Sequence, residues 1–180
     1  MHRHTQLAAL AGLTILAACG RAPLQHSAVQ ASANSDALST ASTARVDRDV
    51  ARVRSATRSF RVLDSAVAAG YIRDVPNCLK HPEHGAMGFH HRNPALADAK
   101  VELERPEIIL YGRTEKGDHE LTGVEYIVPY RAQPREGEPP TVMGQKLKRS
   151  DDLKLWYLHV WIWRDNPSGL FNDWNPSVEC

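Results

Sequence analysis

The first 18 residues decide which part of this chain can belong to a folded domain. Residues 1–4 form a short start with one certain positive charge, Arg3, and residues 7–18 are almost wholly small or apolar. A run of this length is too short to span a bilayer as a mature helix, but it suits the apolar region of a secretory signal peptide. We therefore expect residues 1–18 to be a signal peptide that is removed on export.

The apolar run ends in Leu16-Ala17-Ala18-Cys19, which closely resembles the lipobox of bacterial lipoproteins. The resemblance implies cleavage just before Cys19 and lipidation of this cysteine, with diacylglycerol and palmitate. Two or three acyl chains give stable membrane attachment. The expected location is the cell envelope, on the outer side of the cytoplasmic membrane or on the outer membrane, facing the periplasm. An ordinary signal peptide followed by a chance cysteine is the alternative.

Charge does not point to a particular partner. The chain has 22 lysine and arginine residues against 21 aspartate and glutamate residues, and removal of residues 1–18 takes away only Arg3. The mature chain is therefore formally neutral. Proteins that bind nucleic acid carry a basic surface, so we expect no nucleic-acid partner. Because no second apolar run is long enough for a transmembrane helix, the lipid on Cys19 is the expected membrane contact.

Three cysteines are present, and lipidation would use Cys19. Cys78 and Cys180 then remain, and an oxidising compartment would let them form a disulfide. Such a bridge would pin residue 180 to the start of the domain. In the chain-entropy model, a closed loop of about 100 residues is worth about 4.7 kcal/mol. Two free thiols that act as metal ligands are the alternative.

Composition divides the mature chain into a tether and one domain. Residues 19–44 hold the lipidated cysteine and a tract rich in Ala, Ser, Thr and Gln, which predicts a flexible tether. Residues 45–180 are predicted to form a single globular domain. It begins with an amphipathic helix over about 44–69, ended by Gly70, because apolar residues recur every three or four positions. These positions are Val46, Val50, Val53, Thr57, Phe60, Leu63 and Val67.

Segments of high β-propensity follow the predicted helix. Strands are predicted at 108–111, 124–128 and 156–163. Lys116-Gly117-Asp118 between the first two is typical of a hairpin turn. Irregular loops and turns are predicted at 71–106, 129–152 and 166–180. The expected fold class is α+β, with one long N-terminal amphipathic helix packed on a small antiparallel sheet and with long irregular loops.

The last predicted strand has two different faces, because side chains alternate along a strand. One face is apolar and suits a core against the helix; it holds Trp156, Leu158, Val160 and Ile162. The other face places His159 among the aromatic residues Tyr157, Trp161 and Trp163, as in the wall of a ligand pocket. These three aromatic residues are candidate ligand-binding residues. A half-exposed face with a hydrogen-bonded histidine is the alternative.

His90, Glu125 and His159 are candidate metal ligands. In an extended segment His90 would face away from Phe89 and His91, which share the other side. Glu125 interrupts an apolar strand, so it faces either solvent or a buried partner, because an unpaired buried charge is costly. Two imidazoles and a carboxylate suit a divalent metal such as zinc, iron or manganese and leave positions for water or substrate. Metal-free acid–base chemistry by Glu125 and a histidine is the alternative.

Four short segments together resemble a family of exported bacterial proteins without an assigned function. They are Gly-Ala-Met-Gly-Phe-His (85–90), Gly-Val-Glu-Tyr (123–126), Leu-His-Val-Trp-Ile-Trp (158–163) and Asn-Pro-Ser-Gly-Leu-Phe (166–171). The similarity extends over about residues 45–180. It implies export, and it assigns no activity and no ligand to any residue.

Three functions are therefore compatible with the sequence. The first is a metal-binding surface lipoprotein whose partner is a small molecule or an envelope component, with its status as an enzyme left open. The second is a non-catalytic module that binds carbohydrate or another flat ligand on its aromatic face. The third is a structural envelope lipoprotein. The metal hypothesis requires His90, Glu125 and His159 to converge on one point.

Overall fold

The computed structural model describes residues 24–73 and 77–180, with side chains from Ser35 onward in these ranges. The predicted signal peptide and Cys19 lie outside the described residues. The chain divides into two compact units, with the boundary in the sequence between Leu38 and Ser39. The first unit is described as helical backbone from Leu24, and the second unit, Ser39–Cys180, contains the sheet.

The helical part consists of α1 (Leu24–Thr57), the 3-10 helix η1 (Arg58–Arg61) and α2 (Leu63–Ala68). The predicted single helix over 44–69 was wrong at its start and in its continuity. No glycine or proline occurs within α1, and its alanines favour helix even without large apolar residues. Within the described residues, no helix is long and apolar enough to cross a membrane.

Val62 interrupts the predicted helix and changes which residues are buried after it. Its backbone is extended, with φ −97° and ψ 113°, so the apolar period restarts in α2. Val53 and Thr57 are fully buried as predicted, whereas Val67 is 50% exposed and Ala66 is buried in its place. The apolar stripe therefore ends at Leu63, which packs against the core.

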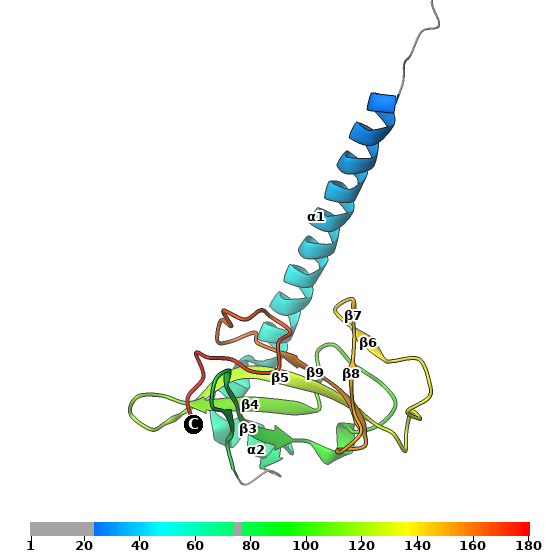
Figure 1. Cartoon of the computed structure of the whole chain (residues 1–180). Coiled ribbons are helices and arrows are strands. Elements are labelled where there is room, and N and C mark those ends of the chain that lie inside the picture. The colour runs from blue at the N-terminus through cyan, green and yellow to red at the C-terminus, as the bar shows by residue number, and fades with distance from the viewer. Residues whose placement is uncertain (1–23, 74–76) are drawn as a thin grey trace, which may run out of the picture. The chain divides into compact units, whose positions relative to one another are not determined.

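The described strands form a seven-stranded sheet and a separate two-stranded one, and every pairing among them is antiparallel (Figure 1). The order in the large sheet is β1-β3-β4-β5-β9-β8, with β2 also paired to β3, and β6 and β7 form the small sheet. The strands are β1 (Ile72–Arg73), β2 (Leu79–His81), β3 (Gly85–Arg92), β4 (Ile108–Arg113), β5 (His119–Pro129), β6 (Thr141–Val142), β7 (Gln145–Lys146), β8 (Lys148–Ser150) and β9 (Leu155–Val160). The α+β class is confirmed.

Several predicted boundaries in the sheet were wrong: β5 begins at His119 rather than at residue 124, and the loop predicted at 129–152 contains the short strands β6, β7 and β8. Residues 71–106 are not irregular throughout, because β3 runs through them and pairs with β4. Strand β9 ends at Val160 rather than at residue 163. The predicted hairpin turn is confirmed: Thr114 N–H donates to the carbonyl of Asp118, and Gly117 has the positive φ of 86° that this turn requires.

Each face of the large sheet carries its own apolar cluster. The larger cluster joins residues of the helical part, such as Val53, to alternate residues of the central strands, such as Val124, Tyr126 and Leu158. The smaller cluster lies on the opposite face. There Leu110 and Ile127 pack with Trp161, which directly follows β9, and with Val178 near the C-terminus. That opposite face also carries the candidate metal ligands.

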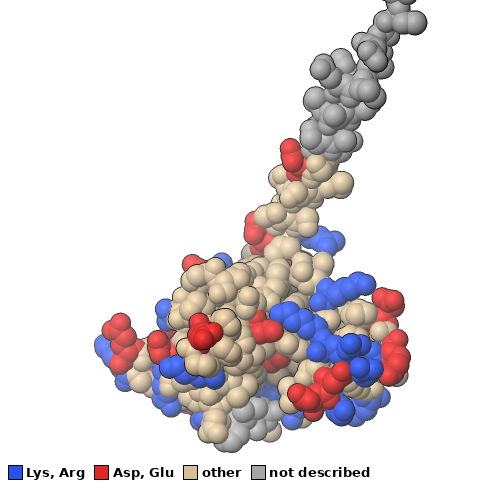
Figure 2. Space-filling model, viewed as in Figure 1, with Lys and Arg blue, Asp and Glu red and all other residues tan. Residues whose placement is uncertain are grey.

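The charged residues of the surface are mixed in sign. On the face seen in Figure 2, lysine and arginine side chains are interspersed with aspartate and glutamate. This distribution agrees with the near-neutral formal charge of +1 for the whole chain.

Candidate metal centre

Three strands bring His90, Glu125 and His159 together. Glu125 on β5 pairs directly with His159 on β9. His90 lies on β3, which is separated from β5 by β4, and it pairs with Leu110 of β4. Because side chains alternate, all three project from the face opposite the larger cluster. The predicted parity of His90 is confirmed, since Phe89 belongs to the larger cluster and His91 packs on Tyr111.

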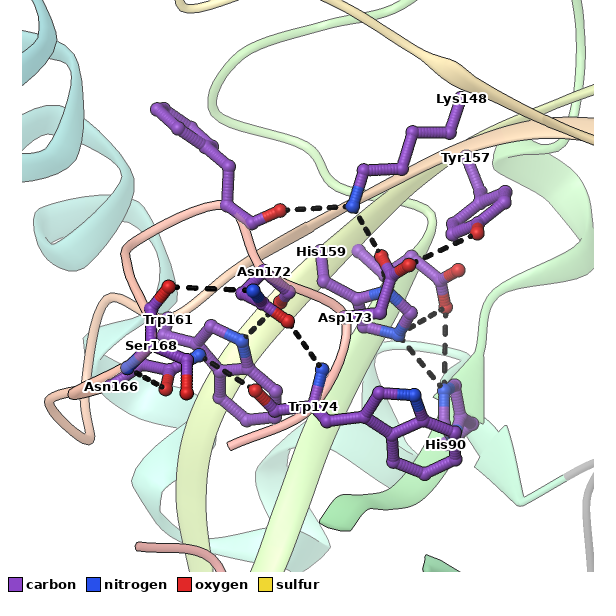
Figure 3. A network of polar contacts seen from close by, with 12 residues as sticks. His90, Lys148, Tyr157, His159, Trp161, Asn166, Ser168, Asn172, Asp173 and Trp174 are labelled. Carbon is purple, nitrogen blue, oxygen red and sulfur yellow. Dashed lines mark hydrogen bonds and ion pairs between the residues drawn. The ribbon is translucent and has the colours of Figure 1, made fainter. Parts of the chain in front are cut away.

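The three side chains meet at their polar atoms, and Figure 3 labels two of them, His90 and His159. His90 Nε2 lies 3.4 Å from His159 Nε2 and 3.5 Å from Glu125 Oε2, and His159 Nε2 lies 3.8 Å from Glu125 Oε2. A circle through these three atoms has a radius of about 2.1 Å, which is also about the length of a zinc bond to an imidazole nitrogen or a carboxylate oxygen. The group therefore could hold a metal ion.

Burial makes the three residues suitable as ligands. His90 and Glu125 are each 6% exposed, and His159 is 2% exposed. Burial, followed by the neighbouring His159, lowers the pKa of His90 from 6.5 to about 3. His90 is therefore a neutral imidazole at neutral pH, with a nitrogen lone pair that can bind a metal.

Asp173 supports His159 from the side away from Glu125. Its Oδ1 lies 3.5 Å from His159 Nδ1 and 2.6 Å from Lys148 Nζ, and Tyr157 donates its hydroxyl hydrogen to Oδ2 at 3.2 Å (Figure 3). Burial alone would raise the pKa of Asp173, but the neighbouring His159 and the hydrogen bond from Lys148 lower it to about 2. A carboxylate in this position favours a proton on Nδ1 of His159, which leaves Nε2 free to bind metal.

The predicted aromatic face is only partly assembled. Trp161 stacks on His159, with ring planes 13° apart and centroids 6.2 Å apart, and it is 2% exposed. Its indole nitrogen donates to the carbonyl of Asn172 at 2.7 Å. Tyr157 lies on the same side, at 5.8 Å from the ring of His159. Trp163 follows the end of β9 and instead packs against the larger cluster, where its indole nitrogen donates to Thr57 Oγ1.

The predicted disulfide between Cys78 and Cys180 is confirmed, and it joins positions with a sequence separation of 102. It ties the C-terminal residue to the segment just before β2 and β3. An isolated β-bridge between Ala86 and Asn175 holds the same segment nearer the centre. Because Asp173 lies in this segment, the bridge and the disulfide help to position the carboxylate that contacts His159.

Sequence reasoning missed Asp173 and Lys148. Asp173 lies in a segment of turns and Lys148 in a short edge strand, and neither has a local pattern that marks a site. Sequence reasoning also missed Glu107, a carboxyl group that is 1% exposed and lies directly before β4. Its position directly after Pro106 and before an apolar strand was the available signal.

Comparisons with known proteins supply no assignment. A scan of the sequence against protein-family models found no match, and searches among curated proteins and among solved structures found none either.

Proposed function

We propose that this chain is an exported, lipid-anchored protein that binds one divalent metal ion through His90, Glu125 and His159. The observation that carries the metal proposal is the convergence of their Nε2, Oε2 and Nε2 atoms, each within 3.8 Å of the other two. Imidazole and carboxylate groups are common zinc ligands, and one metal ion would bind all three of these buried groups at once.

Zinc is the first candidate. For bonds of about 2.1 Å, ligand atoms lie about 3.4 Å apart in a tetrahedron and about 3.0 Å apart in an octahedron. The separations of 3.4, 3.5 and 3.8 Å are nearer the tetrahedral value, and two histidines with one carboxylate form a known ligand set of catalytic zinc sites. Three protein ligands leave the fourth tetrahedral position for water or a substrate oxygen, which a bound zinc ion would polarise.

Elemental analysis tests the metal proposal. The full chain, purified in mild detergent, is freed of metal with EDTA, incubated with zinc and desalted. We expect about one zinc per chain. Glu125→Gln and His159→Gln should each lower the zinc content to a small fraction, because each removes a ligand. His84→Gln is the matched control, since His84 is exposed and belongs to no ligand group among the described residues. Full zinc content in both ligand variants would refute the proposal.

Two observations support the proposed lipid anchor: the lipobox-like residues 16–19, and a disulfide of the kind found in exported proteins. Disulfides persist outside the cytosol, and the Cys78–Cys180 bridge agrees with export. The test is metabolic labelling of the expressing cells with palmitate. We expect label on the wild-type chain and none on Cys19→Ser, and a labelled Cys19→Ser chain would overturn the anchor.

A ligand-binding aromatic face is the weaker alternative. A stacking platform needs exposed ring faces, whereas Trp161 is buried against His159 and Trp163 lies with the larger cluster. These contacts favour a supporting role for the aromatic residues around the metal centre.

A further inference from the structure

A cavity lies on the sheet face that carries the metal centre. Its volume is about 240 Å³, and three cations line it: Arg92, Arg131 and Lys154. Arg92 follows His90 by two residues on β3, and the lining residue Ile127 follows Glu125 by two residues on β5. Because alternate residues share a face and lie about 7 Å apart, this cavity is a neighbour of the metal centre along the strands.

The lining of this cavity has one sign of charge. No aspartate or glutamate belongs to it among the described residues. Three cations around one concave surface attract an anion, and two guanidinium groups favour a carboxylate or phosphate through paired hydrogen bonds.

The floor of the cavity is apolar. Ile127 and Pro129 are buried residues of β5, and Leu155 is the first residue of β9. At the edge, Leu153 also lines the cavity and is 71% exposed. A ligand with a short apolar body would cover this side chain.

The backbone at Lys154 is unusual. Its φ is +56°, a left-handed conformation that residues other than glycine and asparagine seldom adopt. The fold keeps a lysine there, and its carbonyl accepts a hydrogen bond from Tyr130 N–H at 2.9 Å. A cation held at a position that favours glycine is consistent with a role for its charge.

We propose that this cavity binds a small amphipathic carboxylate, with the anionic head between Arg92, Arg131 and Lys154 and the apolar body over Ile127 and Leu155. The volume of about 240 Å³ is below the roughly 300–1,000 Å³ of sites for drug-sized molecules, so the ligand is small. This proposal does not depend on the metal, because none of its residues is a metal ligand.

Calorimetric titration of the metal-free full chain in detergent tests the proposal, with blank titrations into detergent alone. The probes are hexanoate, hexanamide, which lacks the charge, and acetate, which lacks the apolar body. We expect hexanoate to bind at least ten-fold more tightly than either of the other two. Equal affinity for hexanoate and hexanamide would overturn the proposal, whatever the outcome of the zinc measurements.

Two variants assign the binding to this cavity. Arg131→Ala removes an exposed loop cation, and Lys154→Gly removes a charge while its φ suits glycine, so both should fold. We expect each to weaken hexanoate binding at least three-fold. Arg58→Ala is the matched control, because Arg58 is exposed on η1 and does not line the cavity. Unchanged hexanoate binding in the double variant would contradict the assignment.

Discussion

Asp173 shows how a residue that binds no metal can still decide how well a metal binds. Its carboxylate sits between His159 Nδ1, Lys148 Nζ and the hydroxyl of Tyr157. Such carboxylate–histidine pairs fix the tautomer and the orientation of a metal-binding imidazole, and their loss commonly costs about ten- to a hundred-fold in metal affinity. The strength of the proposed site therefore depends on a residue 14 positions away from its nearest ligand in sequence.

We predict that Asp173→Asn weakens zinc binding by about ten- to a hundred-fold, because an amide holds the His159 tautomer less firmly. Competition with a chromophoric chelator measures the affinity. Asp152→Asn is the control, since Asp152 is exposed near the same edge strand. An affinity within two-fold of wild type for Asp173→Asn would show that Asp173 does not support the site.

Glu107 is a buried carboxyl group outside the ligand set. It is 1% exposed, and its Oε2 accepts a hydrogen bond from Ile127 N–H at 3.0 Å. Burial raises its pKa from 4.5 to about 8, although the hydrogen bond from Ile127 acts in the opposite direction. The folded chain therefore holds a proton on Glu107 that the unfolded chain releases above pH 4.5.

This difference predicts a pH dependence of stability. Between about pH 4.5 and 8 the folded state binds more protons than the unfolded state, so the contribution of Glu107 is full at low pH and is lost as pH rises. Glu107→Gln keeps an acceptor for Ile127 N–H without the ionisation. We expect this variant to unfold at a higher urea concentration than wild type at pH 8. Its free energy of unfolding should be higher by on the order of 3 kcal/mol at pH 8, with a smaller increase at pH 5.

Urea titrations of metal-free protein at both pH values measure this effect. Glu115→Gln, a change at an exposed glutamate, should leave the pH dependence as in wild type. The same dependence in Glu107→Gln and wild type would exclude Glu107 as its source.

The candidate ligands were predictable at the residue scale because strand alternation is a local property. The side chain of Glu125 lies on the other face of the sheet from its neighbours Val124 and Tyr126. The side chain of His159 likewise lies on the other face from Leu158 and Val160, as the sequence indicates. Asp173 was not predictable, because its contact with His159 depends on how the C-terminal segment crosses the sheet. That path is set by a disulfide and a β-bridge between segments far apart in sequence.

At the scale of elements, β3 was not predicted from the sequence because its glycines suggested a loop. Gly88 has φ +85°, and a Cβ atom there would lie 2.4 Å from the carbonyl oxygen of Tyr111. The glycines of β3 thus allow close approach of neighbouring backbone rather than marking a loop. A search for alternating apolar residues missed this strand, although β4, β5 and β9 have enough β-branched and aromatic residues to be predicted.

We predict that Gly88→Ala destabilises the fold by more than about 2 kcal/mol, because it adds a steric clash to an unfavourable φ. Gly117→Ala is a matched control: its φ is +86°, but a Cβ there meets nothing within 4 Å. Chemical denaturation of both variants separates the clash from the conformational cost. Equal destabilisation by the two changes would mean that the contact with Tyr111 is not limiting.

The helical part was predictable in kind but not in extent. Apolar spacing marks the residues that pack on the sheet, such as Val53 and Thr57, and these are buried. It does not mark Leu24–Thr43, where alanine propensity rather than packing favours a helix. The extended backbone at Val62 leaves no pattern in the sequence, so the end of the helix was not predictable.

At the scale of the whole molecule, the disulfide closes a loop of 102 residues within the second unit. A crosslink over such a loop restricts the unfolded chain and so stabilises the folded one. It also anchors the segment that carries Asp173 and that supplies Val178 to the smaller apolar cluster. Stability and metal binding are thus expected to depend on the same bridge.

We predict that the double variant Cys78→Ser, Cys180→Ser loses about 2–5 kcal/mol of unfolding free energy. Guanidinium titration measures the loss, and wild type reduced with a dithiol should behave like the variant. If the variant unfolds at the denaturant concentration of oxidised wild type, the bridge does not stabilise the fold.

The most direct test of the metal centre is anomalous X-ray diffraction at the zinc edge from crystals of the zinc-loaded protein. The predicted result is one strong peak within about 2.2 Å of His90 Nε2, Glu125 Oε2 and His159 Nε2. A zinc-loaded crystal with no peak at bonding distance from these three atoms would contradict the account.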